Sequence, residues 1–576
     1  MNQKLENILN VSLDATEDEL RKADSLSTGY NWRDNTWEII VKYSGSLESI
    51  RNRYNVYIKE LLNYYAIIVA DKATIELVSQ EDVIDYVEKP KSLYYQIERT
   101  KTAAYVGSVR ADGNILSGKG VIVGVIDTGI DIFDNAFRNS DGTTRILNIY
   151  DQTTGEKYDK QSIDEYIRLN EDLSGGTFSY DNAPGVDNIM HGTDVSYIAA
   201  GSLGVAYEAD IIAVKMGYSI NNQFPRTTSL MDAIDYIIRK AIEYRKPVAV
   251  NISYGCNYGA HNGNTLLESF IDDISKSYRC VICVGSGNEA DKAIHFGGII
   301  NTGQVQTAYL SVGEYQSAID IQIWKNYWDT IDVMLINPRG EQIGIITEGR
   351  INRYETYNTE IITLLGEPSP YNIYQEIYIN LIPKTDYILS GIWQIVLMAG
   401  SIRAGEYNIW LPSSQALGYA TAFNNPTADG TITIPATARN CIAVGAYNAY
   451  TNSYAAFSGR GFDNSIRNVN AGVKPDITAP GVDISIARQR GNDITYRNVT
   501  GTSYAVPVVT GAAALLMQWG IVMGNDRFMY GEKLKAALID GSKPVGLVGI
   551  TRNDNQPDPR TGWGAVCLKN TLNKIL

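Results

Sequence analysis

Cysteine and calcium-binding motifs are sparse in this sequence. Five cysteines in 576 residues are an odd number in a long chain, so we expect free buried thiols and a reducing compartment. Cys280 and Cys283 form a C-x-x-C, but in a strand their side chains point to opposite faces, which argues against a redox or zinc site. No D-x-[DN]-x-[DN]-G loop stands out. We therefore predict no cofactor and no metal site from the residues themselves.

Positive charge and long apolar runs are also in short supply. The formal net charge is −14, which argues against nucleic acid or an anionic membrane as a partner. No run of about 18 apolar residues stands out, so no membrane span is expected. Residues 1–20 contain no apolar segment after a basic start, and we expect no secretory signal.

The chain is too long for one core, and its patterns change along its length. Residues 1–30 read as a short helical extension with Asp18, Glu19 and Arg21 on a polar face. Residues 36–96 then follow a β-α-β-β-α-β order typical of a small ferredoxin-like domain. From Gly118 strands and helices alternate, which predicts an α/β fold with a parallel sheet and helices on both faces. The helical signal vanishes between about 303 and 418, where short alternating strands predict an all-β insertion, a sandwich or a jelly roll. The predicted units are 1–96, 97–302, 303–418 and 419–576.

Residues 500–519 contain a small-residue turn that leads into an apolar helix. The segment Gly501-Thr502-Ser503 delivers a serine to the first helical turn, among unpaired N–H donors. Such a serine is either a nucleophile or an ordinary N-cap, and the stretch alone does not decide between them. Pro507 lies early enough in the helix for its missing N–H to have little effect.

Three further polar residues follow predicted strands or enter predicted helices of the same α/β unit. Asp127 ends a buried strand, His191 enters a small-residue helix, and Asn288 follows a strand among glycines. In parallel sheets reactive groups gather beyond the carboxyl ends of the strands. A serine nucleophile needs an imidazole base, the imidazole needs a carboxylate, and a nearby amide can stabilise an oxyanion. A core histidine and a turn asparagine are the structural alternatives.

These motifs, in this order, resemble the signatures of the subtilisin-like serine proteases, the subtilases: Asp127-Thr-Gly, His191-Gly-Thr, Gly287-Asn288 and Gly501-Thr-Ser503-Tyr-Ala-Val-Pro. The resemblance implies a serine endopeptidase in which Asp127 orients the base, His191 is the base and acid, Ser503 attacks, and Asn288 lines the oxyanion hole. It also implies that Ser253, Tyr254 and Gly255 pair with the substrate backbone as an added strand. Subtilases commonly bind calcium, so a calcium site stays open.

The front domain resembles a subtilase propeptide, whose C-terminal tail lies in the active-site groove. Subtilases usually place their aspartate about 30 residues into the mature chain, which predicts self-cleavage near Gln96-Ile97. The partners expected are therefore a protein or peptide substrate and the chain's own propeptide, with the protein a monomer.

A narrower resemblance is to the Csp-type subtilases of spore-forming clostridia, which activate a cortex-degrading hydrolase during germination. It implies processing of a protein zymogen and a cytoplasmic or spore-associated location. The β insertion is expected to brace the catalytic domain. One departure from the family pattern is Asp194, a carboxylate one turn after His191 that we expect to face away from it. Two alternatives remain: a catalytically silent subtilase-fold binding protein, and an esterase, which would need a G-x-S-x-G motif that is absent.

Overall fold

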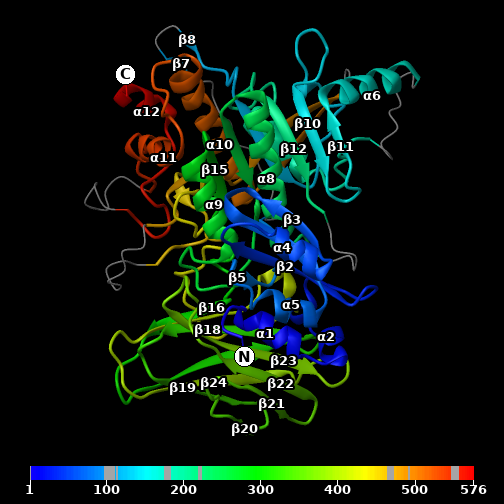
Figure 1. Ribbon diagram of the computed structural model, residues 1–576. Helices are drawn as coiled ribbons and strands as arrows, with labels where there is room; N and C mark the ends of the chain where they lie inside the picture. Colours follow the sequence, from blue (N-terminus) through cyan, green and yellow to red (C-terminus); the bar gives the residue numbers. More distant parts are fainter. Residues whose placement is uncertain are drawn as a thin grey trace.

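The computed structural model describes residues 2–96, 110–111, 114–173, 183–217, 224–462, 473–490, 493–546 and 557–575. The chain forms three bodies, which we call the N-terminal domain (residues 2–96), the parallel-sheet domain (114–294 and 424–575) and the β insertion (295–423). In Figure 1 the N-terminal domain, in blue, lies across the front of the molecule, between the parallel-sheet domain above and the β insertion below.

The N-terminal domain has the predicted β-α-β-β-α-β order, with sheet order β5-β2-β4-β3 and the short β1 also paired to β2. Residues alternate between the two faces of this sheet, as the strand period requires. Ile40 packs toward the parallel-sheet domain, whereas Ile39 and Val41 pack toward the domain's own helices. The elements are α1 (Asn7–Asp14), α2 (Glu17–Lys22), α3 (Asp24–Ser27), β1 (Tyr30–Asn31), β2 (Thr36–Tyr43), α4 (Glu48–Tyr54), β3 (Tyr57–Leu61), η1 (Leu62–Tyr64), β4 (Tyr65–Ala70), α5 (Lys72–Val78), β5 (Ile84–Glu88) and β6 (Tyr94–Tyr95).

The parallel-sheet domain is built on a nine-stranded sheet of order β11-β10-β12-β9-β13-β15-β27-β28, with β29 also paired to β27. Its central strands are buried along their whole length, which explains their continuous apolar sequences. The strands are β9 (Ile122–Asp127), β10 (Ile146–Asp151), β11 (Lys157–Asp159), β12 (Asp210–Lys215), β13 (Val248–Ile252), β15 (Cys280–Gly285), β27 (Ile442–Asn448), β28 (Ser453–Tyr454) and β29 (Ile477–Pro480). Outside this sheet lie β7 (Arg110–Ala111), β8 (Asn114–Ile115), β14 (Tyr254–Gly255), β30 (Ile484–Arg490) and β31 (Asp493–Val499).

Helices cover both faces of this sheet, as predicted. Side chains of α7 and α10 pack on one face, and side chains of α8 and α9 pack on the other. Cys283 lies in the first of these cores and Cys280 in the second, so the C-x-x-C does point to opposite faces. All five cysteines are free thiols. The helices are η2 (Asn135–Phe137), α6 (Lys160–Leu173), α7 (His191–Ala200), α8 (Thr227–Tyr244), α9 (Leu266–Ser277), α10 (Thr502–Met517), η4 (Gln518–Val522), α11 (Gly531–Asp540) and α12 (Leu568–Ile575).

Helix α10 runs through the centre of the parallel-sheet domain. Residues Thr502–Val522 are long and apolar enough to cross a membrane, a window that the sequence reading overlooked, but 83% of this window is buried inside the protein. Pro507 lies in the second turn of α10, where its missing N–H leaves the Ser503 carbonyl without its helical donor. The Ser253 hydroxyl donates to that carbonyl at 3.4 Å, so a side chain from the neighbouring strand end replaces the lost bond.

The β insertion consists of two antiparallel sheets around a shared apolar core. One sheet has the order β16-β25-β18-β23-β22-β21 and the other β20-β19-β24-β17-β26. Its first strand, β16, lies upstream of the predicted start at residue 303. The elements are β16 (His295–Ile299), β17 (Val305–Val312), β18 (Ile319–Asn326), β19 (Ile331–Ile336), β20 (Gln342–Ile343), β21 (Ile351–Glu355), β22 (Thr359–Leu365), β23 (Tyr374–Pro383), β24 (Gly391–Ala399), β25 (Glu406–Trp410), η3 (Ser414–Ala416) and β26 (Ala422–Phe423).

The N-terminal domain and the β insertion share one apolar core. Side chains of β22 and β23, among them Ile362 and Ile382, are buried together with those of α1 and β2. Glu19 is only 1% exposed and is paired with Arg353 of the insertion, Nε to Oε1 at 2.8 Å, so placing it on a polar face was wrong. It also closes a capping box with Thr16 at the start of α2. The insertion therefore packs directly against the N-terminal domain, and its predicted role as a brace of the catalytic domain stays a prediction.

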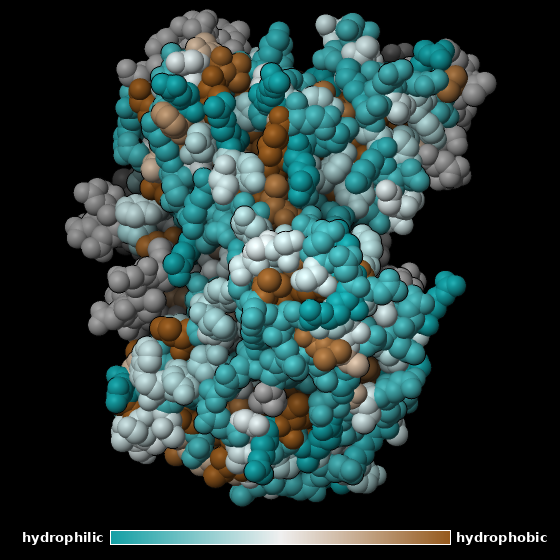
Figure 2. All heavy atoms as spheres, viewed as in Figure 1, coloured by the Kyte–Doolittle hydropathy of each residue, from teal (hydrophilic) through white to brown (hydrophobic). Residues whose placement is uncertain are grey.

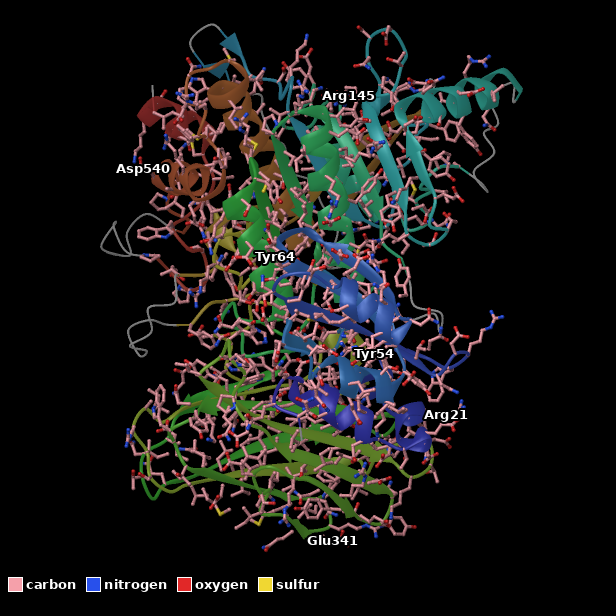
Figure 3. All side chains as sticks on the ribbon, viewed as in Figure 1. Arg21, Tyr54, Tyr64, Arg145, Glu341 and Asp540 are labelled. Carbon is pink, nitrogen blue, oxygen red and sulfur yellow. The ribbon has the colours of Figure 1, made fainter. Side chains whose placement is uncertain are left out.

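The face seen in Figure 2 is mostly hydrophilic, with apolar residues in small separate patches. In Figure 3, Glu341 marks the end of the β insertion farthest from the parallel-sheet domain. Tyr64, at the end of η1, marks the edge of the N-terminal domain that meets α9.

Replacing Ile382 by Ala is expected to lower the free energy of unfolding by about 2–5 kcal/mol, because the fully buried side chain leaves a cavity in the shared core. Chemical denaturation measures this change. Limited proteolysis is expected to detach the N-terminal domain sooner. Ile373→Ala is the matched control, since Ile373 is 59% exposed on the same insertion. Equal effects of the two substitutions would contradict the shared core.

Candidate active site

Asp127, His191 and Ser503 lie at strand ends and helix starts of the parallel-sheet domain, where α7 packs against both β9 and α10. Among the described residues, His191 contacts Asp127, and no hydrogen bond joins His191 to Ser503. Asp127 is the last residue of β9, His191 the first residue of α7, and Ser503 the second residue of α10. All three are buried. The parallel strands of the sheet share one carboxyl edge, and reactive groups gather beyond that edge.

A short contact joins Asp127 and His191. His191 Nδ1 lies 2.6 Å from Asp127 Oδ1, which also accepts the Thr128 N–H at 2.8 Å. The close packing of the start of α7 against the turn after β9 requires glycine at Gly192, because a Cβ there would lie 2.3 Å from the Gly129 carbonyl oxygen. Burial lowers the pKa of His191, but the charge and hydrogen bond of Asp127, together with the charges of Asp194 and Asp187, raise it above its ordinary value of 6.5. The other ring nitrogen, Nε2, is buried with no hydrogen-bond partner among the described residues.

The carbonyl group of Gln96, at the end of the N-terminal domain, lies against Ser503. The Ser503 hydroxyl donates to the Gln96 carbonyl oxygen at 2.7 Å, and the Ser503 N–H donates to the same oxygen at 3.3 Å. The predicted cleavage partner Ile97 lies outside the described residues. The peptide carbonyl at which Ser503 would attack is thus held beside the hydroxyl.

Asn288 follows β15 and turns its amide toward the start of α10. Its Oδ1 accepts the Thr502 N–H at 3.1 Å and the Thr502 hydroxyl at 3.0 Å. These two bonds fix the side chain and identify Nδ2 as the atom on the side away from Thr502. Nδ2 is buried and has no hydrogen-bond partner among the described residues. A fixed, unused donor beside the Ser503 N–H suits an oxyanion.

The segment 253–255 pairs with the tail of the N-terminal domain. Strand β14 runs antiparallel to β6, with Tyr254 opposite Tyr95 and Gly255 opposite Tyr94. The Gln96 N–H donates to the Ser253 carbonyl at 3.3 Å. The tail therefore adds a strand to the edge that β14 offers.

The Gln96 side chain fills a polar recess next to Ser503. Its Nε2 donates to the Gly285 carbonyl at 3.2 Å and to the Thr433 hydroxyl at 3.1 Å, while Oε1 accepts the Thr502 hydroxyl at 3.3 Å. A Cβ at Gly285 would lie 1.9 Å from Oε1, so only glycine leaves room there. Sequence reasoning missed Thr433, which lies outside every motif and gives no local signal.

Asp194 faces a hairpin and not the imidazole. Its carboxylate accepts from Arg488 Nε at 2.9 Å, and Arg497 lies 3.2 Å from its other oxygen. Arg488 also donates to the Met190 carbonyl at 2.8 Å. The hairpin β30–β31 is therefore bonded to the turn that precedes His191. Burial raises the pKa of Asp194, although both guanidinium groups oppose this shift.

The other two histidines have structural surroundings. His261 and His295 both stack on Trp410, and the two ring nitrogens of His261 lie 2.6 Å from the Ile432 carbonyl oxygen and 3.2 Å from that of Asn257. Burial lowers the pKa of His261 to about 4. Across the described ranges, no three His, Cys, Asp or Glu side chains are grouped to hold a metal ion.

An aspartate, a histidine and a serine at the edge of a parallel sheet, with an asparagine beside the serine, are typical of serine hydrolases of the subtilisin type. The chain belongs to the subtilase family, whose model matches residues 118–368 and 404–564. The model of the Csp protease B prodomain matches residues 3–91, so the N-terminal domain is a prodomain of Csp type.

Relatives agree with this membership. The solved structure of the Clostridium perfringens CspB protease is 34% identical, with a TM-score of 0.72, over 80% of this chain and 94% of that one. The subtilase-type proteinase RRT12 of Saccharomyces cerevisiae is 33% identical over 22% of this chain and 23% of its own length. Subtilisin-like protease 10 of Arthroderma otae is 34% identical over 21% of this chain and 27% of its own length. The chain thus matches about a quarter of the length of these two curated relatives.

Replacing Arg488 by Met is expected to lower the free energy of unfolding by about 3 kcal/mol, because it leaves the buried Asp194 carboxylate with only the half-exposed Arg497. Thermal or chemical denaturation measures the loss. Adding Asp194→Asn to this variant removes the stranded charge and is expected to recover most of the stability. Arg527→Met, at an exposed arginine of the same domain, serves as control. A double variant no more stable than Arg488→Met would count against this charge pairing.

Proposed function

We propose that this protein is a serine endopeptidase that cuts its own chain after Gln96 and then processes a protein substrate. Ser503 is the nucleophile, His191 the base and acid, Asp127 the residue that orients the imidazole, and Asn288 a donor of the oxyanion hole. The observation that carries the proposal is the Gln96 carbonyl oxygen, bonded to both the hydroxyl and the N–H of Ser503.

In the first step the Ser503 oxygen bonds to the Gln96 carbonyl carbon while its proton passes to His191 Nε2. That nitrogen has no competing hydrogen bond among the described side chains and main-chain groups. The raised pKa of His191 makes the imidazole a stronger proton acceptor than an ordinary histidine. Asp127 holds Nδ1–H and stabilises the cation that forms.

The carbonyl oxygen becomes an oxyanion in this step. The Ser503 N–H already bonds it, and Asn288 Nδ2 supplies the second donor as charge develops. The Gln96–Ile97 bond then breaks, with His191 returning its proton to the leaving amine. Water, deprotonated by the same imidazole, hydrolyses the ester and frees Ser503.

The recess around the Gln96 side chain supports a preference for glutamine before the cleaved bond. A neutral amide matches it, since the Gly285 carbonyl and the Thr433 hydroxyl both accept from the amide nitrogen of Gln96. The Csp-type prodomain and the likeness to the CspB protease support a protein zymogen as substrate, within spore germination. A spore-associated location and a monomeric state belong to the same proposal.

Intact-mass spectrometry of the purified full chain beside Ser503→Ala tests self-cleavage. We expect the wild-type protein to split into two fragments at Gln96 and the variant to stay whole, because alanine has no nucleophile. A fluorophosphonate probe, which labels an activated serine, is expected to label wild type only.

If the wild-type chain stays whole and unlabelled, the site is silent and the alternative, a subtilase-fold binding protein, takes its place. If the chain stays whole but Ser503 is labelled, the nucleophile works and the cleavage site is wrong.

Replacing Gln96 by Glu is expected to slow self-cleavage roughly 10- to 100-fold, because the Gly285 carbonyl loses its donor and faces a carboxylate instead. A time course of cleavage by gel measures this rate. Gln80→Glu, an exposed change in the same domain, is the matched control and is expected to cleave normally. Equal rates for the two variants would refute glutamine recognition.

A further inference from the structure

The segment of the β insertion between β25 and β26 lies beside the tail of the N-terminal domain. It leaves β25 at Trp410 and passes through the short helix η3. Ala416 packs against the core that also holds Tyr95, and Leu417 packs against the core of the insertion. The segment is therefore fixed between two bodies of the protein.

The peptide unit between Tyr95 and Gln96 has two polar groups that point in opposite directions, because a trans peptide places C=O and N–H on opposite sides. The Gln96 N–H points to β14, where it bonds the Ser253 carbonyl. The Tyr95 carbonyl must then point away from β14. The strand that binds the peptide cannot reach this oxygen.

Gln415, in the middle of η3, reaches it from the other side. Its Nε2 donates to the Tyr95 carbonyl oxygen at 2.5 Å. The peptide unit next to the cleaved residue is thus held from both sides, by β14 through its N–H and by Gln415 through its C=O. The side chain of Gln415 is otherwise exposed, so it has little role in the core.

Glu289 connects this segment to the turn that carries Asn288. It follows Asn288 directly, is 6% exposed, and accepts the Ser414 N–H at 3.1 Å and the Ser414 hydroxyl at 3.2 Å. Burial raises the pKa of Glu289 to about 7. One buried carboxyl group therefore links the residue that carries Asn288 with the residue before Gln415.

We propose that Gln415 is a substrate-binding residue, and that the β insertion completes the groove by supplying it. It binds the main-chain carbonyl of the residue that precedes the one cleaved. This role rests on the proposed function and adds to it. Because the contact is with the backbone, it serves any peptide in the groove, whatever side chain stands at that position.

The rate of self-cleavage tests the proposal in full chains made by cell-free translation and sampled over time. Gln415→Glu keeps the length of the side chain but has no donor, and is expected to cleave about 3- to 10-fold more slowly. Gln415→Lys keeps a donor and is expected to stay within about 2-fold of wild type. Tyr419→Ala, at a 98% exposed residue of the same segment, is the control. Melting temperatures are expected to match, so a merely structural role would not separate Glu from Lys.

A second measurement does not depend on catalysis. In chains that carry Ser503→Ala, hydrogen exchange at the Gln96 amide is expected to speed up about 3- to 10-fold with Gln415→Glu. Cleavage by Gln415→Glu at the wild-type rate would overturn the proposal. If even the wild-type chain stays whole, the proposed function fails separately, and exchange alone decides: a faster rate supports binding by Gln415, and an unchanged rate overturns it.

Discussion

The pairing of two short strands, β6 and β14, is the contact on which the site depends. It places the Gln96 carbonyl against Ser503 and the Gln96 side chain in its recess. Two residues of strand are a weak attachment in isolation. They hold here because the whole N-terminal domain is packed against α8 and α9 and delivers its tail in a fixed register. The groove and its occupant are thus one structure.

The β insertion contacts both partners of this pairing, the N-terminal domain and the parallel-sheet domain. It shares a core with the N-terminal domain, and Arg353 adds buried ion pairing at the same face. Its segment between β25 and β26 is also bonded to Glu289, which directly follows Asn288. The insertion therefore contacts both the domain that carries the tail and the turn that carries Asn288 and Glu289, so a shift of the sandwich would move both.

Much of the fold and of the candidate site could be predicted from the sequence. The motif residues follow strand ends or start helices, and the apolar residues recur with clear strand and helix periods. The ferredoxin-like order, the parallel sheet and the meeting of Asp127 with His191 needed only local patterns. The features that could not be predicted are contacts between residues that lie far apart in the sequence. Glu19 looked exposed because its partner, Arg353, lies more than 300 residues away. No local pattern indicated that the Ser253 hydroxyl, between β13 and β14, would donate to the carbonyl that Pro507 leaves without its helical donor. Thr433 and Gln415 contact the tail without any motif of their own.

The core shared by the N-terminal domain and the β insertion has a consequence for the order in which the protein is made. Both bodies precede α10 in the chain, and domains fold as they leave the ribosome, N-terminal first. The tail can be anchored, and the site that holds it can be enclosed, before residue 503 has been added to the chain. The groove would then already be occupied when Ser503 joins the site, so the first peptide bond beside this serine would belong to the chain itself.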